Sequence, residues 1–505
     1  MSGPKHQVII IGGGPNGLAA AALLARSGRG VTVLEAAPRL GGLAAGDEFL
    51  PGFVAPGVHH DAALVRPWVV GKLGLQLTRA PRADLVLPPA AGSGGGEIVV
   101  PMDGDGIRGA TAEDEAAWRR FRALTAKVRP ALLKVWDAKP LSVRDSLWSL
   151  AKTGWAVRKL GAETMMELLR IAPMCIADWM RDAFATERLR AGLALGALEG
   201  QFTGPWSAHT ALNLLVREAL AAGEVEGGGP ALVRALEAAA RAAGAELRVG
   251  ASVVKILVGR DGVTGVRLAS GDELQAATVL STVDPKQTFL KLVGAPWLPL
   301  ELDQAARVFR MRGSEAVLQL ALSSPLVTAA GTLARHLRTG DSLDRIEQGF
   351  DASKYRRYAT PPALDVRVTA AAGGAPVAGQ KAVASIRVFA ASYDLEGGWT
   401  DAARAGLSEA VLTELEGACP GVRKSVLGMQ LLTPPDIEAR WQLSGGHLLH
   451  GEHAPDQFLS FRPALSAGRY TTPIRGLVLG GGGSHPGGGL TLGPGALAAQ
   501  AIIAG

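Results

Sequence analysis

The sequence predicts an α/β protein of several folding units, and three observations support this prediction. A short apolar segment near the N-terminus runs into a glycine-rich turn and then into an alanine-rich helix pattern. Helical periodicity dominates residues 105–222, whereas alternating apolar and polar residues predict strands within residues 223–285 and 296–440. The length of 505 residues corresponds to about three folding units at roughly 150 residues each.

Composition narrows the class of protein. The chain is 48% hydrophobic and 19% charged, which excludes a disordered chain because enough apolar surface is present to offset the ordering entropy. Two cysteines, Cys175 and Cys419, are too few for a disulfide framework and lack the paired spacing of a zinc site, so we expect a reducing compartment. The longest apolar runs fall short of the roughly 20 residues of a membrane-spanning helix. A strand pattern starts almost at residue 1 and leaves no room for a leader, so we expect a cytoplasmic protein.

The net charge and its distribution bear on whether the protein contacts nucleic acid or an anionic membrane. The formal net charge of +6 permits attraction to anionic surfaces, but no basic cluster is interleaved with aromatic residues, so we expect no nucleic-acid partner. Two amphipathic patterns, residues 118–132 and 144–160, carry basic residues between their apolar positions. Such helices either pack on the protein with a solvated charged face or make a peripheral contact with an anionic membrane.

The N-terminal segment carries a nucleotide-binding motif. Residues 6–11 predict a buried strand, three glycines follow with the spacing G-x-G-x-x-G, and residues 18–26 predict a helix. The first glycine allows a tight turn, the second lets the backbone approach a pyrophosphate, and the third lets the helix pack close to the strand. The first helical turn, where a proline is tolerated, presents free N–H groups to the phosphates. The predicted contacts are Gly12, Gly14, Pro15, Asn16 and Gly17.

An acidic residue completes this motif. A second predicted strand, residues 30–34, ends in Glu35, about 20 residues after the middle glycine, where a carboxylate can accept hydrogen bonds from ribose hydroxyls. The same carboxylate disfavours a 2′-phosphate and therefore argues against NADP. A lone G-x-G-x-x-G also occurs as an ordinary glycine turn, but strand, helix and acidic residue in register predict a Rossmann-like nucleotide site.

The segment after Glu35 distinguishes FAD from NAD. It continues into Arg39 and the doublet Gly41–Gly42, and here the sequence resembles FAD domains of the glutathione-reductase and amine-oxidase type. The resemblance implies that the doublet lies along the dinucleotide and that the arginine lies near its phosphates; alternatively, Arg39 is a solvated surface charge. It also implies that residues 223–285 form a second part of the FAD domain. The contacts it implies are Glu35, Ala36, Arg39, Gly41, Gly42 and Val253.

The C-terminal segment has the most specific pattern. A predicted strand, residues 477–480, enters a glycine-rich turn over residues 481–489, and a helix is predicted from about Gly493. A glycine backbone can approach a flat ligand closely, and the helix start favours negative charge. This arrangement suits a reduced flavin, which is negative near N1 and C2=O. The predicted contacts are Gly481, Gly483, His485, Gly488, Gly489 and Leu490.

Together these motifs resemble the phytoene desaturase-like family of FAD-dependent oxidoreductases, in the branch with carotenoid ketolases and the pyridine nucleotide-disulfide oxidoreductase domain-containing proteins. The resemblance extends over essentially the whole chain; Leu492 departs from it, because similar sequences often have glycine there. It implies an α/β fold with a discontinuous, Rossmann-like FAD domain, and a discontinuous α+β substrate domain with a mixed sheet and a helical cap. The implied FAD domain comprises residues 1–104, 223–295 and 441–505, and the substrate domain residues 105–222 and 296–440.

The resemblance also implies an activity. Noncovalent FAD would accept a hydride from a carbon–carbon bond of a long hydrophobic substrate, isoprenoid or carotenoid-like, held in an apolar tunnel. A ketolase, a saturase, a redox-neutral isomerase and a non-catalytic FAD-stabilised interaction protein stay open on the same scaffold, as do a monomer and a homodimer. We find no aromatic pair near the C-terminus that would flank an amine, which argues against an amine oxidase. The sequence lacks a second G-x-G-x-x-G motif that would bind NAD(P)H, and it lacks a C-x-x-C pair. Both absences argue against a disulfide reductase.

Histidines are the candidate proton-transfer groups. His59, His60 and Asp61 form a polar group in apolar sequence, and His485 lies in the glycine-rich turn. A histidine at these places could exchange a proton near neutral pH, so His485 and His60 are the candidate catalytic residues, although either could be a satisfied structural group. We predict no metal site, because the segment with three regularly spaced histidines is glycine-rich and is not expected to be helical. These three residues are His447, His450 and His453.

Overall fold

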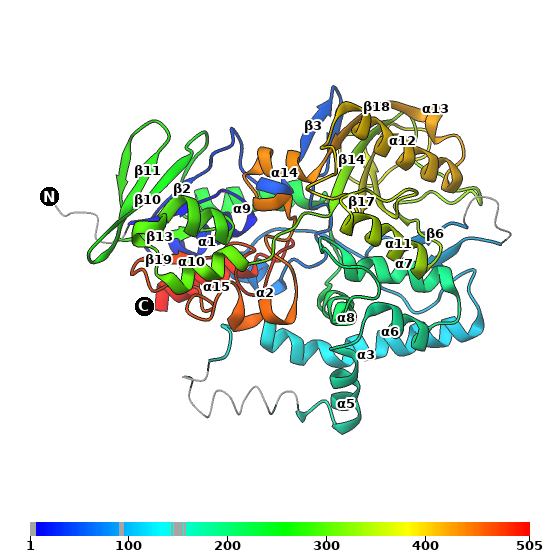
Figure 1. The fold of residues 1–505 in the computed structure, drawn as a ribbon, viewed down its shortest axis with the longest axis horizontal. Helices are drawn as coiled ribbons and strands as arrows, with labels where there is room; N and C mark the ends of the chain where they lie inside the picture. Colours follow the sequence, from blue (N-terminus) through cyan, green and yellow to red (C-terminus); the bar gives the residue numbers. More distant parts are fainter. Residues whose placement is uncertain (1–6, 90–94, 143–144, 146–154, 156–157, 505) are drawn as a thin grey trace.

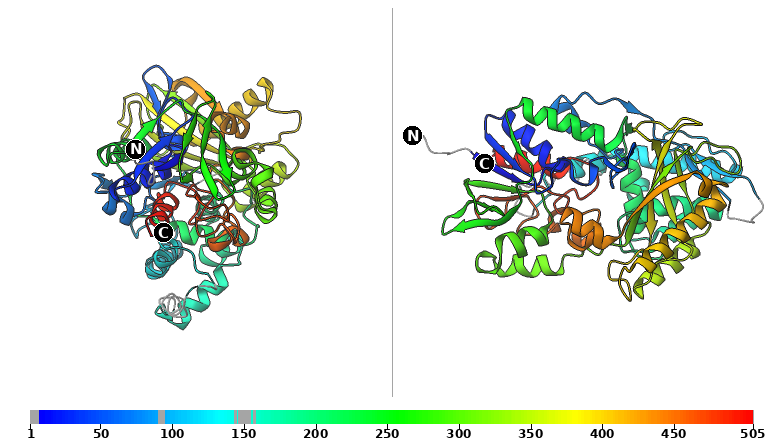
Figure 2. Two further views of the ribbon diagram at one scale, coloured as in Figure 1. Left: turned by 90° about the vertical axis from the view of Figure 1, so that its left-hand side faces the viewer. Right: turned by 90° about the horizontal axis from the view of Figure 1, so that it is seen from above.

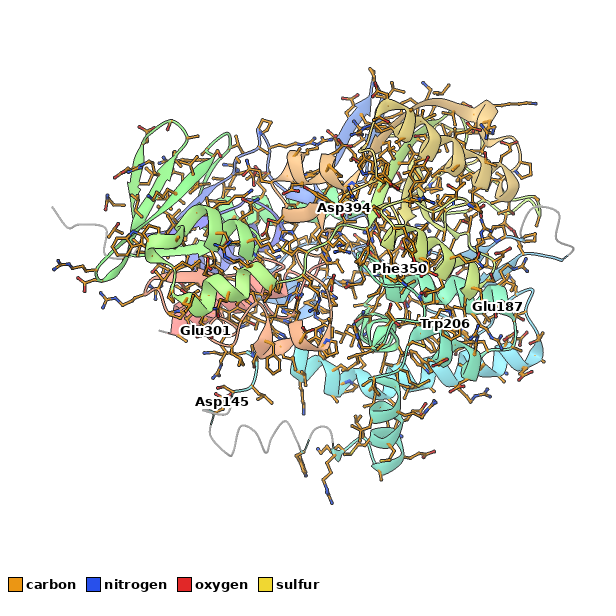
Figure 3. The ribbon with its side chains drawn as sticks, in the orientation of Figure 1. Asp145, Glu187, Trp206, Glu301, Phe350 and Asp394 are labelled. Atoms are coloured by element: carbon orange, nitrogen blue, oxygen red, sulfur yellow. The ribbon has the colours of Figure 1, made fainter. Side chains whose placement is uncertain are left out.

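The protein, seen in a computed structural model, has two regions side by side (Figure 1). The structure describes residues 7–89, 95–142, 145, 155 and 158–504. One region is built on a five-stranded parallel sheet and the other on a seven-stranded mixed sheet. We call them the parallel-sheet region and the mixed-sheet region. Figure 3 locates both by side chains: Glu301 lies in the first, and Glu187 and Phe350 lie in the second.

The parallel sheet is assembled from distant parts of the chain. Its strand order is β19-β13-β1-β2-β9, and every neighbouring pair is parallel. Helix α1 (Pro15–Arg26) packs against both α9 (Gly228–Ala242) and α15 (Gly493–Ala504), and alanines on α1 are fully buried. The strands are β1 (Gln7–Ile11), β2 (Gly30–Leu34), β9 (Glu246–Arg248), β13 (Thr278–Ser281) and β19 (Leu477–Leu479). The predicted α/β fold class and Rossmann-like unit are thereby confirmed.

A small antiparallel sheet lies beside the parallel sheet. It contains β10 (Val253–Gly259), β11 (Gly262–Leu268) and β12 (Glu273–Gln275), and a turn at residues 260–261 joins its first two strands. The π-helix Gln287–Val293 packs on β10, and α10 (Leu300–Val308) packs on that π-helix. There are also two-stranded pairs: β3 (Asp47–Leu50) with β4 (Phe53–Ala55), which packs on the mixed-sheet region, and β5 (Arg79–Ala80) with β8 (Glu224–Val225).

The mixed sheet has two different faces. Its order is β18-β14-β17-β16-β15-β6-β7, and only β15 and β6 run parallel within it. Because side chains alternate along a strand, one face is apolar and packs on α12 (Asp401–Ala418), while the other carries buried polar residues. The strands are β6 (Leu85–Leu87), β7 (Ile98–Val100), β14 (Glu315–Leu322), β15 (His336–Arg338), β16 (Leu364–Ala370), β17 (Ala382–Phe389) and β18 (Val426–Leu432). The buried polar residues are Glu315, Gln319, His336, Arg338, Asp365, Ser385 and Arg387.

The domain division stays a prediction, and two strands bear on its first boundary. β6 and β7 fall within the predicted segment 1–104, yet they hydrogen-bond into the mixed sheet through β15. By sheet membership, β6 and β7 therefore belong to the mixed-sheet region.

Helices cover one end of the mixed-sheet region (Figures 1 and 2). The predicted pattern at 118–132 lies inside α3, where Trp118, Phe121 and Val128 are buried in a core shared with α6, α7 and α8. The structure therefore shows that the apolar face of α3 packs on the protein itself. The pattern at 144–160 lies mostly outside the described residues. The helices are α3 (Ala112–Trp136), α5 (Ala162–Ile171), α6 (Ile176–Ala183), α7 (Glu187–Leu198) and α8 (Thr210–Leu220).

The remaining helices are α2 (Pro67–Leu73), α11 (Leu343–Lys354), α13 (Val422–Ser425) and α14 (Pro434–Trp441). Helix α14 lies between the two regions (Figure 1). Within the described part of the chain, no helix combines the length and the apolar character needed to cross a membrane.

Candidate active site

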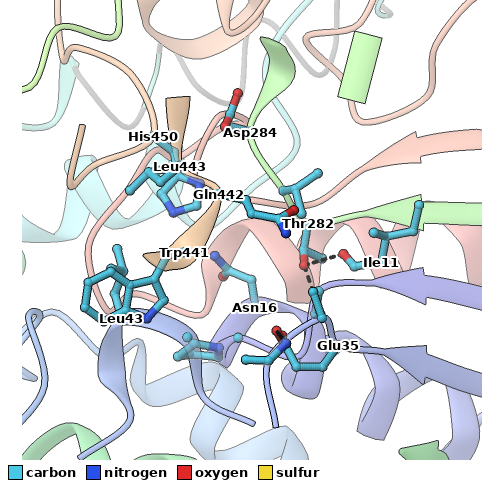
Figure 4. Close-up of a pocket in the computed structure, with 18 of the residues that line it drawn as sticks. Ile11, Asn16, Glu35, Leu43, Thr282, Asp284, Trp441, Gln442, Leu443 and His450 are labelled. Atoms are coloured by element: carbon cyan, nitrogen blue, oxygen red, sulfur yellow. Dashed lines mark hydrogen bonds between the residues drawn. The ribbon is translucent and has the colours of Figure 1, made fainter. Parts of the chain in front are cut away.

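A cavity of about 1520 Å³, its open mouth included, lies at the carboxyl ends of β1, β2 and β13 (Figure 4). We call it the sheet-end cavity; this edge is where open α/β sheets bind ligands. The end of α14, with Trp441, and the residue after it, Gln442, form part of its wall, and the glycine-rich loop before α15 forms another part. The predicted residues that line it are Gly12, Gly14, Pro15, Asn16, Glu35, Ala36, Arg39, Gly42, Val253, Gly488, Gly489 and Leu490.

Two glycines of the N-terminal motif serve different purposes. Gly14 precedes α1 with φ −72° and ψ 176°, and a Cβ built on it would have no heavy atom within 4 Å, so it opens on the cavity. A Cβ on Gly17 would lie 2.0 Å from the carbonyl oxygen of Gly12, so that glycine is required for helix and turn to touch. The first N–H groups of α1 have no intrahelical acceptor, and their positive end faces the cavity. This geometry leaves an open cradle for a phosphate.

Glu35 and Arg39 are held by neighbouring backbone. Glu35 Oε2 accepts a hydrogen bond from Gly13 N (2.7 Å), and Oε1 accepts one from Ala37 N (2.9 Å). A carboxylate has about four acceptor sites, so both oxygens can still accept from ribose hydroxyls. Arg39 donates to Gly46 O (2.8 Å) and to Asp47 Oδ1 (2.7 Å), and its side chain is 44% exposed. The arginine at the cavity wall is thus anchored in an ion pair.

Four predicted contacts lie behind the lining residues. A Cβ on Gly481 would lie 2.2 Å from Thr282 O, and one on Gly41 would lie 2.8 Å from the side chain of Val233. These glycines bring the cavity walls close to the parallel sheet and to α9. These four are the glycines Gly17, Gly41, Gly481 and Gly483; His485, a fifth predicted contact, also lies outside the lining of either cavity.

A second cavity of about 880 Å³ meets the first. Both are lined by His59 and by Gly488, Gly489 and Leu490 of the glycine-rich loop. Trp136 and Phe458 also line the second cavity, with ring centroids 6.2 Å apart and an interplanar angle of 66°. This edge-to-face pair joins a ring from α3 to one from the C-terminal segment, so a single-sequence pattern does not show it, and the expectation that no such pair flanks an amine stays a prediction.

The second cavity is not the purely apolar tunnel that the resemblance implies. Asp61, Glu199 and Arg217 line it, and Arg217 forms ion pairs with both carboxylates. Behind them, Arg387 pairs with Glu199 from the polar face of the mixed sheet. Burial raises the pKa of Asp61, but the charges of Arg217 and Arg367 outweigh it and hold that pKa well below its usual range. The wall is charged but internally neutralised.

The candidate catalytic histidines are placed differently from expectation. His60 donates or accepts at Ser385 Oγ (3.1 Å) and is not among the residues lining either cavity, whereas His59 lines both. His485 is 1% exposed, and its ring lies 6.5 Å from that of Trp136. Burial lowers the pKa of His485 to about 4, which favours a neutral ring; its catalytic role stays a prediction.

The described residues contain no group of three or more His, Cys, Asp or Glu side chains arranged to hold a metal ion. His447 is buried, and its Nδ1 accepts from Leu449 N and Gly451 N, both at 3.3 Å. His450 lines the sheet-end cavity, and burial lowers its pKa to about 4. These histidines hold loop backbone or line the cavity as neutral rings.

Comparison with known families agrees with this geometry. Residues 69–374 match the family of flavin containing amine oxidoreductases, and residues 10–64 match an NAD(P)-binding Rossmann-like domain. The chain belongs to the flavin containing amine oxidoreductases. The cofactor of this amine oxidoreductase family member is FAD, and the predicted resemblance is confirmed.

This amine oxidoreductase family member is also similar to individual proteins and solved structures. It is 28% identical over 558 residues to mouse pyridine nucleotide-disulfide oxidoreductase domain-containing protein 2, covering 99% of this chain and 94% of the relative. It is 28% identical over 400 residues to the lycopene-forming phytoene desaturase of Pseudescherichia vulneris, covering 77% and 75%. A Methanosarcina mazei oxidoreductase (TM-score 0.59, 18% identity, 99% and 100% covered) and a putrescine oxidase bound to putrescine (0.62, 16%, 99% and 98%) share the fold.

The residues present fit FAD. The lining of the sheet-end cavity extends from the start of α1 past Glu35 and Val253 to the glycine-rich loop before α15, which suits an extended dinucleotide. The open cradle at Gly14 suits the pyrophosphate, and Glu35 offers acceptors to a ribose. These residues with Val253 would hold the adenosine and pyrophosphate, and the loop that ends at Leu490 would hold the flavin ring. The individual contacts stay predictions.

Sequence reasoning missed the residues that only the fold brings to the site. Glu199, Arg217 and Trp136 come from the helical part of the chain, where the sequence pattern predicts helices but no site. Their one signal is a charged or aromatic residue within an otherwise apolar helix face. Of the two adjacent histidines, His60 is the predicted catalytic residue, whereas His59 is the one that lines both cavities.

Proposed function

We propose that this protein is an FAD-dependent dehydrogenase that removes hydrogen across a carbon–carbon bond of a long, mainly apolar substrate of isoprenoid or carotenoid-like chemistry. The observation that carries the proposal is the junction of the two cavities at His59 and residues 488–490. A substrate in the second cavity would lie beside the loop predicted to hold the flavin ring. The likeness to a phytoene desaturase supports the same class of reaction.

Bound FAD supplies the hydride acceptor, and the chain has to bind the substrate, orient it and exclude water. Leu64, Val216, Leu220 and Leu449 provide aliphatic wall in the second cavity, which favours an apolar substrate body. Arg217, braced by two carboxylates, provides a rigid polar wall that suits a substrate with a polar group in addition to its apolar body.

His59 contributes a fixed ring at the junction. Its Nε2 lies 2.8 Å from Leu448 O and is therefore the protonated nitrogen, and its Nδ1 faces Arg387 Nη2 at 3.5 Å. Burial, together with the charge of Arg387, lowers the pKa of His59 to about 3. The ring stays neutral at physiological pH and shapes the passage between the cavities without exchanging a proton.

Oxidation of an amine is the second candidate, because the family name and the Trp136–Phe458 pair favour it. An ammonium substrate needs an unpaired carboxylate, and both Asp61 and Glu199 of the second cavity are engaged by Arg217. We therefore place carbon–carbon oxidation first.

The test is an anaerobic absorbance spectrum of the FAD-loaded protein before and after addition of detergent-dispersed isoprenoids, carotenoids and putrescine. Bleaching of the flavin by an isoprenoid or carotenoid supports the proposal, and bleaching by putrescine alone would replace it with amine oxidation. Flavin that stays oxidised with every compound would contradict it and favour an isomerase or an FAD-stabilised interaction protein.

A pair of variants on α8 links the bleaching to the second cavity. Val216→Trp fills the cavity and should slow bleaching at least tenfold, whereas Leu212→Trp, one turn earlier and outside the lining, should leave the rate within threefold. Equal rates in both variants would show that the substrate binds elsewhere.

A further inference from the structure

Arg462 is a fully buried cation with an unusual set of partners. Its side chain is 0% exposed, and within the described part of the chain no carboxylate forms an ion pair with it. Instead the guanidinium donates only to backbone carbonyls. These acceptors are Gly482 O (2.8 and 3.1 Å), Glu452 O (2.8 Å), Gly451 O (3.1 Å), Leu449 O (3.2 Å), Gln457 O (3.3 Å) and His450 O (3.4 Å).

Other buried arginines of this protein have a carboxylate partner. Arg66, at 2% exposure, pairs with Asp137 at 2.7 Å, and Arg338, at 4%, pairs with Asp365 at 2.6 Å. A buried charge is costly unless it is paired, and carbonyl dipoles solvate a cation without neutralising it. The full positive charge of Arg462 is therefore retained inside the protein.

This charge lies directly behind the sheet-end cavity. Gly482, which accepts from both Nε and Nη2 of Arg462, lines that cavity, and so does His450. Gly482 belongs to the glycine-rich loop, residues 481–489, that is predicted to hold the flavin ring. The first turn of α15 adds its positive dipole end close to the same loop.

No neighbouring titratable group in the described structure offsets this charge. Burial lowers the pKa of Arg462 only to about 9, so it stays charged at neutral pH. Burial and the charge of Arg462 lower the pKa of His447 to about 3 and that of His450 to about 4, so both are neutral. Asp284 also lines the cavity, and burial raises its pKa, which disfavours a compensating negative charge.

We propose that Arg462 is an electrostatic residue for the bound flavin, which stabilises the negative charge that the ring gains on reduction. A hydride brings two electrons and one proton, so a neutral oxidised ring that accepts it becomes singly negative, and the balance needs only the hydride donor. A fixed positive charge attracts this anion more strongly than the neutral oxidised ring. Arg462 therefore favours reduction of FAD, whichever substrate supplies the hydride.

The test measures the midpoint potential of the FAD-loaded protein by anaerobic dye equilibration. Arg462→Gln should lower the equilibrium constant for two-electron reduction at least tenfold, which is about 30 mV toward negative potential. Arg462→Lys keeps the charge and should stay within threefold of the unsubstituted protein. Arg129→Gln is the matched control, because Arg129 also donates to backbone carbonyls, of Ala219 and Ala221, and lines neither cavity.

A structural role alone predicts a different result. If Arg462 only tied the loop together, Arg462→Gln would lower thermal stability and leave the potential unchanged, and this outcome would overturn the proposal. An equal shift in the Arg129 control would overturn it as well, because the effect would not be local.

The unsubstituted protein gives a second test that does not depend on folding of the variants. After reduction with dithionite, its flavin should keep the absorbance spectrum of the anionic reduced form from about pH 8 to about pH 6. A spectrum of the neutral reduced form over this whole range would contradict the proposal, because a fixed cation at the ring would have disfavoured that proton.

Discussion

Replacement of Gly14 by alanine should abolish cofactor binding without damage to the fold. The backbone of Gly14 has φ −72°, which any residue adopts, and its Cβ would enter open space. The free protein therefore accepts the methyl group, and the smaller entropy of the unfolded chain could add roughly 0.4–1 kcal/mol of stability. The methyl group would project into the cradle in which the pyrophosphate is expected to meet the backbone.

The expected loss follows from hydrogen bonds to a charged group. A methyl group that pushes the pyrophosphate away from the first turn of α1 breaks about two N–H contacts, each worth roughly 1.5–3 kcal/mol. The sum of about 3–6 kcal/mol corresponds to a loss of FAD affinity of about 10²–10⁴-fold. The matched variant is Gly17→Ala, whose Cβ would lie 2.0 Å from Gly12 O and should destabilise the fold itself by at least about 1–3 kcal/mol.

The assay combines two measurements on each variant. Fluorescence titration with FAD gives the dissociation constant, and thermal unfolding of the flavin-free protein gives the melting temperature. Gly14→Ala should bind FAD weakly and have the melting temperature of the unsubstituted protein, whereas Gly17→Ala should have a lower melting temperature. FAD affinity of Gly14→Ala within threefold of normal would refute the reasoning, and so would a melting temperature as low as that of Gly17→Ala.

Four further outcomes are expected. Glu35→Gln should weaken FAD binding about tenfold in the same titration, since a charge-assisted hydrogen bond is worth about 1.5–3 kcal/mol, and unchanged affinity would remove Glu35 from the site. Arg217→Met removes the cation that Asp61 and Glu199 share, while Arg387 still pairs with Glu199, and should lower the free energy of unfolding by about 1.5–3 kcal/mol in denaturant titrations; a loss below about 1 kcal/mol would contradict this. Burial raises the pKa of Glu315 from its ordinary value of 4.5 to about 8, so the folded state holds a proton that the unfolded chain has already released, and stability should fall as pH rises from about 5 to 8. Glu315→Gln should remove up to about 1.4 kcal/mol per pH unit of that slope, and an unchanged slope would show that other groups cause it. If α5 makes the peripheral membrane contact, replacing its exposed Met166 and Leu169 (66% and 67%) by glutamate should abolish flotation with anionic liposomes, whereas equal flotation would place the contact elsewhere.

Local sequence signals predicted the parallel sheet well. The strand at residues 30–34 has the predicted bounds, and the helix predicted from Gly493 begins there. These elements are set by short-range patterns: an apolar run, a glycine turn, an alanine-rich helix face. The nucleotide half of the cavity follows from them, because residues adjacent in the sequence form it.

Elements that depend on distant partners escaped prediction. β15 has only three residues, His336–Arg338, which are too few for an alternating pattern to be recognised, and its two polar residues are buried on the inner sheet face. Arg462 gave no signal, because its role depends on carbonyls that the fold gathers around it. The second cavity is likewise formed by α3, α7, α8 and the C-terminal loop together, and a single sequence does not show which helices meet.

The parallel sheet combines strands from distant parts of the chain, and this has a consequence for synthesis of the protein in the cell. β1 and β2 leave the ribosome first, but β13 lies between β1 and β19, and α15 packs on α1, so the edge and one covering helix come last. At about 5–20 residues per second, the N-terminal strands wait roughly 20–90 seconds for residues 477–504. During that time their apolar surfaces are exposed to chaperones and to other nascent chains. Complete FAD loading therefore has to wait for synthesis of residues 477–504.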